Sequence, residues 1–340
     1  MRSPIAVVVA VLAVTPVAVA AEVQPFVPVL SEDFPDPFVL PTSSGFLAYA
    51  TNPREGGVNV QMARATNLTD WALLRDGATL HDAMPVLPSW ARPGLTWAPE
   101  VLPTEKGFVL YFTARDRKSN LQCVGAAFAP NSLGPFASAA TEPLVCQTAL
   151  GGTIDPDPFR DTDGQLYLYY KNDGNNPDFK QSTRIFAQKL TPDGLALTGE
   201  AVAIASNDAK WGGGVVEAPT MVRNDDRYIL FYSANYYGWE QDQNLSPYAM
   251  GYAVCSGPMG PCSDAPANPI LYSYRDPRLG CLSGPGHQSV FTAGGRQFIS
   301  FHAWGTVGDC RNAHRGRYLY IAPLIWKNGA PQIGVSLRRP

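Results

Sequence analysis

The chain has little charge of either sign and no surplus of basic residues. Of its 340 residues, 16% are charged, and 26 lysines and arginines stand against 29 aspartates and glutamates. A formal net charge of −3 cannot neutralise a phosphate backbone, which argues against nucleic acid as a partner. The six cysteines and four histidines also lack the Cys-x-x-Cys or histidine-rich spacing of a zinc site.

Stretches with helical periodicity, linkers and low-complexity tracts are missing as well. The chain is 45% hydrophobic, so it can bury a large core, and its 31 glycines and 31 prolines are spread throughout as turn formers. Length alone favours two domains. The repeat described below favours one.

The one long apolar run stands at the N-terminus. It is broken by Thr15 and Pro16, is short for a bilayer span, and is followed by a small-x-small sequence at 18–20. We predict a cleaved signal peptide over residues 1–21, hence a secreted protein, extracellular or periplasmic, without membrane attachment after cleavage. A membrane anchor is the alternative.

An even number of cysteines agrees with an oxidising compartment. Connectivity does not follow from spacing alone, and free buried thiols are the alternative. Proximity in sequence predicts these pairs: Cys123 with Cys146, Cys255 with Cys262, and Cys281 with Cys310.

A motif built around an acidic residue or a histidine recurs five times, each time followed about ten residues later by a short apolar-aromatic strand. These strands cover 46–51, 108–113, 166–171, 228–233 and 298–303. Self-similarity at this period, with strand content, is typical of a β-propeller. We therefore predict an all-β, five-bladed propeller that forms a single catalytic domain over residues 22–340. The motif residues are Asp36, Glu100, Asp155, Glu217 and His287.

The innermost strands of a propeller run in one direction along its axis, so we expect the five motif residues to face one cavity. A carboxylate between apolar strand residues costs several kcal/mol unless it is satisfied or used, which favours a functional role for Asp36 and Glu217. Glu100 contacts either substrate or nearby backbone amides. Asp-Pro and Asp-Gly pairs are common turn formers, which predicts structural roles for Asp33, Asp157, Asp161 and Asp163.

The local sequences around these residues resemble glycoside hydrolase family 43. They are Asp33-Phe-Pro-Asp36-Pro-Phe, Trp97-Ala-Pro-Glu100, Gly152-Thr-Ile-Asp155-Pro-Asp-Pro-Phe, Val216-Glu217-Ala-Pro-Thr and Gly284-Pro-Gly-His287-Gln-Ser-Val-Phe. The similarity runs from about Glu32 to Trp326.

This resemblance implies a five-bladed propeller that acts on arabinose- and xylose-containing polysaccharides. It implies that Asp36 is the general base, that Glu217 is the general acid, and that Asp155 orients the acid and raises its pKa. Hydrolysis with inversion needs one carboxylic acid and one opposing carboxylate, roughly 6.5 to 9.5 Å apart. A third carboxylate beside the acid disfavours its ionisation.

We expect several further residues to line the substrate pocket. Aromatic faces cover the apolar faces of sugars, so Trp97, Tyr236 and Trp239 are stacking candidates, although a packed core uses the same residue types. Arg317 reaches into the pocket or lies on the surface. We assign His302 to the core or the pocket wall.

His287 stands where many family members place a histidine near the propeller axis, often close to a hydrated calcium. No cofactor is expected to be required, and a structural calcium near His287 is the alternative. We expect a monomer whose partner is an oligo- or polysaccharide, with α-L-arabinofuranosyl linkages favoured over β-D-xylosyl ones.

Two other functions remain open. A retaining, invertase-like fructan hydrolase shares the fold and carries an Arg-Asp-Pro motif, which occurs here at Arg275-Asp276-Pro277. That motif falls between the fourth and fifth blades, so we interpret it as a turn. A sugar-binding propeller without catalysis is the other alternative.

Overall fold

The computed structural model describes residues 25–54, 57–208, 210–238, 245–307, 310–335 and 337. The predicted signal peptide and Trp239 lie outside these ranges. Within them, helix is limited to two single turns, Thr148–Leu150 and Lys210–Gly212. No helix among the described residues is long and apolar enough to cross a membrane.

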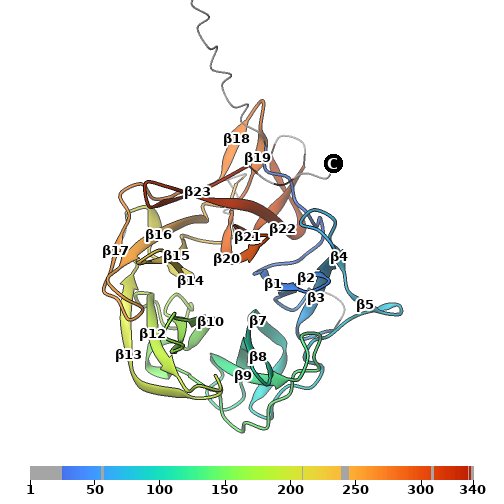
Figure 1. Cartoon of the computed structure of the whole chain (residues 1–340), viewed down its shortest axis with the longest axis vertical. Helices are drawn as coiled ribbons and strands as arrows, with labels where there is room; N and C mark the ends of the chain where they lie inside the picture. Colours follow the sequence, from blue (N-terminus) through green and yellow to red (C-terminus); the bar gives the residue numbers. More distant parts are fainter. Residues whose placement is uncertain are drawn as a thin grey trace, which may run out of the picture.

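Five antiparallel sheets surround a central axis, which confirms the predicted five-bladed propeller (Figure 1). Blade I contains β1 (Phe38–Thr42), β2 (Gly45–Ala50), β3 (Gln61–Ala65) and β4 (Ala72–Leu73). Blade II contains β7 (Ala91–Thr104), β8 (Gly107–Asp116) and β9 (Gln122–Ala129). Blade III contains β10 (Thr153–Arg160), β11 (Leu166–Asn172), β12 (Arg184–Leu190) and β13 (Leu197–Ser206).

Blade IV contains β14 (Val216–Asn224), β15 (Arg227–Ala234), β16 (Ala249–Cys255) and β17 (Cys262–Asp264). Blade V contains β20 (Gly286–Ala293), β21 (Arg296–Val307), β22 (Arg311–Lys327) and β23 (Ala330–Ile333). The innermost strands are β1, β7, β10, β14 and β20. The five apolar-aromatic segments fall in the second strand of each blade.

Two hairpins stand outside the blades. One pairs β5 (Arg75–Asp76) with β6 (Thr79–Leu80), and the other pairs β18 (Tyr274–Asp276) with β19 (Gly280–Leu282). Both project from the ring (Figure 1). The Arg-Asp-Pro motif lies on the second hairpin, where Asp276 accepts the backbone N–H groups of Arg278 and Leu279. It is a turn, as its position in the sequence predicts.

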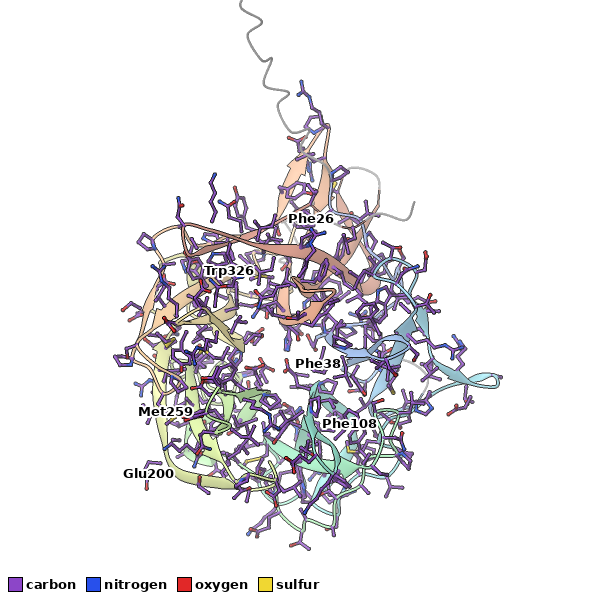
Figure 2. All side chains as sticks on the ribbon, viewed as in Figure 1. Phe26, Phe38, Phe108, Glu200, Met259 and Trp326 are labelled. Atoms are coloured by element: carbon purple, nitrogen blue, oxygen red, sulfur yellow. A yellow bond between two sulfur atoms is a disulfide. The ribbon has the colours of Figure 1, made fainter. Side chains whose placement is uncertain are left out.

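Each second strand carries a fully buried aromatic ring at its fourth repeat position. Three of these rings are tyrosines, and their hydroxyls donate to a carbonyl in the outer turn of the following blade, so each ring also ties one blade to the next. The carbonyls belong to Ser132, Gly194 and Pro258. Figure 2 shows side chains filling the spaces between blades. The five aromatic residues are Tyr49, Tyr111, Tyr169, Phe231 and Phe301.

The N-terminal segment closes the ring against blade V. Val29 and Leu30 donate their backbone N–H groups to the carbonyl of Leu319 on β22, and Leu319 donates back to Leu30. Phe26 packs edge-on against Phe301, with ring centroids 5.8 Å apart. Blade V, which the C-terminal strands form, is thus also bound by the N-terminal segment.

All three predicted disulfides are present. The first joins β9 to the outer edge of blade II, the second joins β16 to β17 in blade IV, and the third ties the β18–β19 hairpin to blade V. They link Cys123 to Cys146, Cys255 to Cys262, and Cys281 to Cys310.

Candidate active site

One non-glycine residue in the left-handed backbone region belongs to each blade. It lies within the innermost strand in blades II to V and just before that strand in blade I. These residues are Asp36, Ala98, Asp155, Ala218 and His287, with φ between 45° and 57°. Where the residue falls within a strand, the strand ladder shifts register beside it. Such strained backbone costs of order 1–3 kcal/mol and clusters at functional sites. Asp36, Asp155 and His287, together with Glu217 beside Ala218, line one cavity.

The bulge also reveals the register of the repeat. Asp36, Asp155 and His287 occupy the left-handed position itself, Glu217 stands one residue before it, and Glu100 stands two residues after it. The expectation that all five face one cavity is therefore wrong for Glu100. Its side chain pairs with that of Asp157 instead.

Hydrogen bonds between blades fix four of the five left-handed residues in place. The left-handed residue donates its backbone N–H to a side chain at the end of the preceding blade's second strand. The acceptors are Thr51 Oγ1 for Ala98 (2.9 Å), Thr113 Oγ1 for Asp155 (3.2 Å), Ser233 Oγ for His287 (2.8 Å) and His302 Nδ1 for Asp36 (3.1 Å).

Asp36 is a buried carboxylate surrounded by cationic and donor groups. Its Oδ1 lies 2.9 Å from Arg317 Nη1 and 3.2 Å from His287 Nδ1, and its Oδ2 accepts from Thr51 Oγ1 at 2.5 Å. Burial by itself raises the pKa of Asp36, but Arg317 first and the histidines next outweigh it and hold that pKa well below its usual range. Asp36 is therefore ionised at neutral pH.

Glu217 accepts two hydrogen bonds. Lys171 Nζ donates to its Oε2 at 3.2 Å, and the Tyr248 hydroxyl donates to its Oε1 at 2.7 Å. Burial raises the pKa of Glu217, but Lys171, Tyr248 and His287 outweigh it and leave the pKa below its ordinary value.

Asp155 lies between the other two carboxylates, and its Oδ2 accepts the backbone N–H of Ala218 at 2.9 Å. Burial, together with the charges of Glu217 and Asp36, raises the pKa of Asp155 to about 6, although His287 and Lys171 oppose the shift. Asp155 thus anchors the residue that follows Glu217 and takes up the proton more readily than Glu217 does in the substrate-free site.

These carboxylates open into a cavity of about 610 Å³ at the centre of the ring. Four of the residues predicted to bind substrate line it, namely Trp97, Tyr236, His287 and Arg317, while Trp239 lies outside the described residues. Arg317 also stacks over Tyr237, 5.5 Å from the ring centroid. The other lining residues are Asp36, Thr51, Arg115, Ile154, Asp155, Asp173, Asn175, Asn176, Pro177, Asp178, Glu217 and Tyr237.

Asp157 has structural contacts, as predicted, but it lies within a strand and not in a turn. It lies buried in β10, where Oδ2 accepts the backbone N–H of Met221 at 2.9 Å and the carboxyl shares a hydrogen bond with Glu100. Burial raises the pKa of Glu100 well above its usual range and that of Asp157 to about 7. The pair holds a proton under conditions where free carboxyls have lost theirs.

Three residues that touch the acid and base were not predicted from the sequence: Lys171, Tyr248 and Thr51. For Lys171 a signal was present, since it is the one charged residue in the apolar segment 166–171. Tyr248 and Thr51 carry no such signal, because tyrosine and threonine are ordinary in strands. His302 was assigned to core or pocket wall and is wholly buried beside Asp36.

No three histidine, cysteine or carboxylate side chains converge to hold a metal ion in the part of the chain that the structure describes. His287, the residue expected near a calcium, turns its Nδ1 toward Asp36. The structural calcium stays a prediction, and no step proposed below depends on it.

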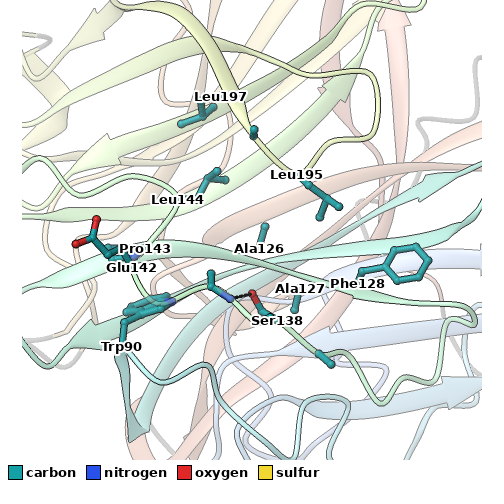
Figure 3. Close-up of a pocket in the computed structure, with 14 residues that line it drawn as sticks. Trp90, Ala126, Ala127, Phe128, Ser138, Glu142, Pro143, Leu144, Leu195 and Leu197 are labelled. Atoms are coloured by element: carbon teal, nitrogen blue, oxygen red, sulfur yellow. Dashed lines mark hydrogen bonds between the residues drawn. The ribbon is translucent and has the colours of Figure 1, made fainter.

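A second cavity of about 530 Å³ lies on the outer side of blades II and III. Figure 3 shows its lining, which includes Trp90, Phe128, Leu144 and Leu195. Its one ionisable lining residue is Glu142. Because it lacks convergent polar groups, it does not compete with the central cavity as a candidate site.

The chain is similar to known proteins in both sequence and fold. The sequence profile of the glycosyl hydrolases family 43 matches residues 27–331. A thermostable family-43 glycoside hydrolase is 27% identical with a TM-score of 0.77, over 93% of this chain and 98% of that one. An endo-1,4-beta-xylanase from Bacteroides thetaiotaomicron is 26% identical with a TM-score of 0.72, over 92% and 98%.

At lower identity the likeness is one of fold. An alpha-L-arabinofuranosidase from Lactobacillus brevis is 19% identical with a TM-score of 0.68, over 94% of this chain and 99% of that one. None of the curated proteins compared with the chain is a significant match.

Proposed function

Since the chain belongs to glycosyl hydrolases family 43, we propose that it is a secreted, inverting glycosidase that cleaves α-L-arabinofuranosyl linkages of plant cell-wall polysaccharides. Membership makes it a glycoside hydrolase with a polysaccharide substrate. The linkage, the stereochemistry and the export are the proposal. The family assignment replaces the fructan hydrolase alternative.

The observation that carries the mechanism is the contrast between the surroundings of Asp36 and Glu217 in one cavity. Asp36 faces Arg317 and His287, which keep it ionised and able to take a proton from an attacking water. Glu217 lies close enough to Asp155 for its negative charge to raise the pKa of that carboxyl, so the two form a pair of interacting carboxyls. That pair supplies the proton that a leaving oxygen needs, and Glu217 is the member that protonates it.

The order of events follows from these contacts. A sugar that enters the cavity displaces water around Asp155 and Glu217, which further disfavours two negative charges side by side. The proton that Asp155 holds below about pH 6 in the free site is then available to Glu217. Glu217 protonates the leaving oxygen while Asp36 deprotonates the water on the opposite face of the sugar ring.

β-D-Xylosyl linkages are the second candidate. The neighbour that supports them is the endo-1,4-beta-xylanase, at 26% identity over 92% of this chain. α-L-Arabinofuranose and β-D-xylopyranose present similar stereochemistry around the reacting carbon, so one acid and base pair serves both. Residues of the pocket rim then decide between them.

Export is supported by the three disulfides, which persist in oxidising compartments. N-terminal sequencing of the protein recovered from outside the producing cell checks the predicted cleavage after residue 21. A mature chain that still begins at Met1 would contradict it.

The function is tested with a panel of aryl α-L-arabinofuranosides and aryl β-D-xylosides, together with linear and branched arabinan and xylan. Proton NMR before mutarotation identifies the anomer released first. We expect arabinose with inverted configuration. Release of the retained anomer overturns the mechanism, and no hydrolysis of any substrate leaves a sugar-binding propeller as the better description.

A further inference from the structure

Lys171 departs from the repeated pattern of residues that connects each blade to the next. It is the last residue of the third apolar-aromatic segment, and the matching residues in blades I, II and IV are Thr51, Thr113 and Ser233. Those three hydroxyls each accept the N–H of a left-handed residue in the next blade. A lysine ammonium has no acceptor capacity, so it cannot make this contact.

Another group makes the contact that Lys171 cannot. The N–H of Ala218, the left-handed residue of blade IV, donates to Asp155 Oδ2 at 2.9 Å. The junction of blades III and IV is thus closed without Lys171, and the ammonium is free for a different contact. A purely structural role would be served by a threonine or serine, as in blades I, II and IV.

The Lys171 side chain is wholly buried, with 0% of its surface exposed. Lysine is almost never buried without a partner. Its Nζ donates to Glu217 Oε2 at 3.2 Å and to Asn175 Oδ1 at 2.6 Å. Asn175 lies on the exposed rim of the central cavity, in the loop between β11 and β12. One ammonium therefore bridges the predicted acid and the rim.

The link between Glu217 and Asn175 indicates which side of the substrate Asn175 borders. The acid stands on the leaving-group side of a glycosidic bond and the base on the opposite side. Asn175, joined to Glu217 through Lys171, therefore borders the leaving-group side of the cavity.

We propose that Lys171 is a positioning residue of this site, which holds the carboxyl of Glu217 toward the leaving oxygen and links it to Asn175 on the rim that receives the leaving group. The inference rests on the proposed function, because it takes Glu217 as the proton donor. Groups from every neighbouring element face Glu217 and share in setting its charge: Lys171, Tyr248, His287, Asp155, Asp173 and Tyr237.

The first test is the titration of Glu217 itself. In protein labelled with ¹³C at glutamate Cδ, the Glu217 signal is assigned by its loss in Glu217→Gln and followed against pH. Lys171→Met keeps the volume and removes the charge, so the Glu217 pKa should rise. Asn175→Ala leaves Glu217 as the one described acceptor of the ammonium, so the Glu217 pKa should fall. Lys189→Met, at an exposed lysine of the same blade, is the control and should leave the Glu217 pKa unchanged.

An unchanged Glu217 titration in Lys171→Met overturns the inference, as does a shift of the same sign in both variants. Lys171→Thr installs the residue that blades I and II use, so it covers the case in which Lys171→Met does not fold. It should shift the Glu217 titration upward as Lys171→Met does. These readouts need no activity, so they fail independently of the proposed function.

The second test is kinetic. Lys171→Met should lower kcat about tenfold or more on an oligosaccharide, whose leaving group needs protonation, and much less on a dinitrophenyl glycoside. The basic limb of its pH profile should move to higher pH. Equal losses on both substrates with an unmoved basic limb would show that Lys171 only supports packing. If the wild-type chain hydrolyses neither substrate, the proposed function is contradicted. The Glu217 titration then tests the inference about Lys171 without it.

Discussion

At the scale of single residues, the surroundings of Asp36 and Glu217 predict unequal consequences of removing them. Glu217→Ala should reduce cleavage of oligosaccharides by roughly 10²–10⁴-fold, yet spare much of the activity on a dinitrophenyl glycoside, whose leaving group departs without protonation. Asp36→Ala should abolish both activities, because Asp36 is the described carboxylate that contacts both the guanidinium of Arg317 and the ring of His287. Steady-state kinetics on the two substrates measures this. Equal losses for Glu217→Ala would assign the acid elsewhere.

Asp155 offers a second test at this scale. Asp155→Asn keeps an oxygen to accept the N–H of Ala218 but removes a negative charge beside Glu217. In the wild type the last proton of Asp155 and Glu217 leaves at about pH 6, whereas in the variant Glu217, whose own pKa lies below its ordinary value, has to hold that proton alone, so the acid ionises at lower pH. The basic limb of the pH profile of kcat/KM should therefore move down, while the acidic limb, set by Asp36, stays. An unmoved basic limb with a near-normal rate would show that Asp155 serves the backbone alone.

At the scale of elements, the bulges of the innermost strands depend on hydroxyls from the preceding blade. Thr113 is fully buried and accepts the N–H of Asp155 at 3.2 Å. Thr113→Val keeps the shape but leaves that N–H without a partner, which should cost about 1–3 kcal/mol of unfolding free energy. Urea denaturation measures the loss. Thr198→Val, at an exposed threonine of β13, is the matched control and should stay within about 0.5 kcal/mol of wild type.

At the scale of the whole molecule, the buried pair of Glu100 and Asp157 couples the stability of the ring to pH. Both pKa values are raised in the folded state, that of Asp157 to about 7. The folded chain therefore holds protons that the unfolded chain releases above about pH 4. The stabilisation is fully present below that pH and is lost as pH rises toward 7.

Glu100→Gln retains a hydrogen bond to Asp157 and removes one of the two charges. The fall in Tm between pH 5 and pH 8 should therefore be smaller than in wild type, by calorimetry at several pH values. Asp155 also titrates in this range, since its pKa is raised to about 6. The difference in Tm between variant and wild type at each pH isolates the contribution of Glu100 and Asp157. Identical slopes of Tm against pH would contradict a link between this pair and stability.

The repeat, the propeller and the carboxylates of the central cavity could be predicted from the sequence, and so could the disulfide pairs, on the assumption that neighbouring cysteines pair. These features are local: each apolar-aromatic segment and each acidic motif is complete within a few residues. The pairing of cysteines also followed from proximity, because all three bridges join residues at most 29 apart.

The positions of the motif residues relative to the left-handed residue of each blade became visible only in the tertiary structure. A single left-handed residue in each blade sets Glu217 one position before Asp155 in the repeat and carries Glu100 away from the cavity. The tertiary structure also decided which groups share protons, because those contacts cross between blades. Lys171 meets Glu217 across 46 residues and Arg317 meets Asp36 across 281. No local pattern encodes such distances, since closure of the ring is what brings the strands' bulged ends to one point.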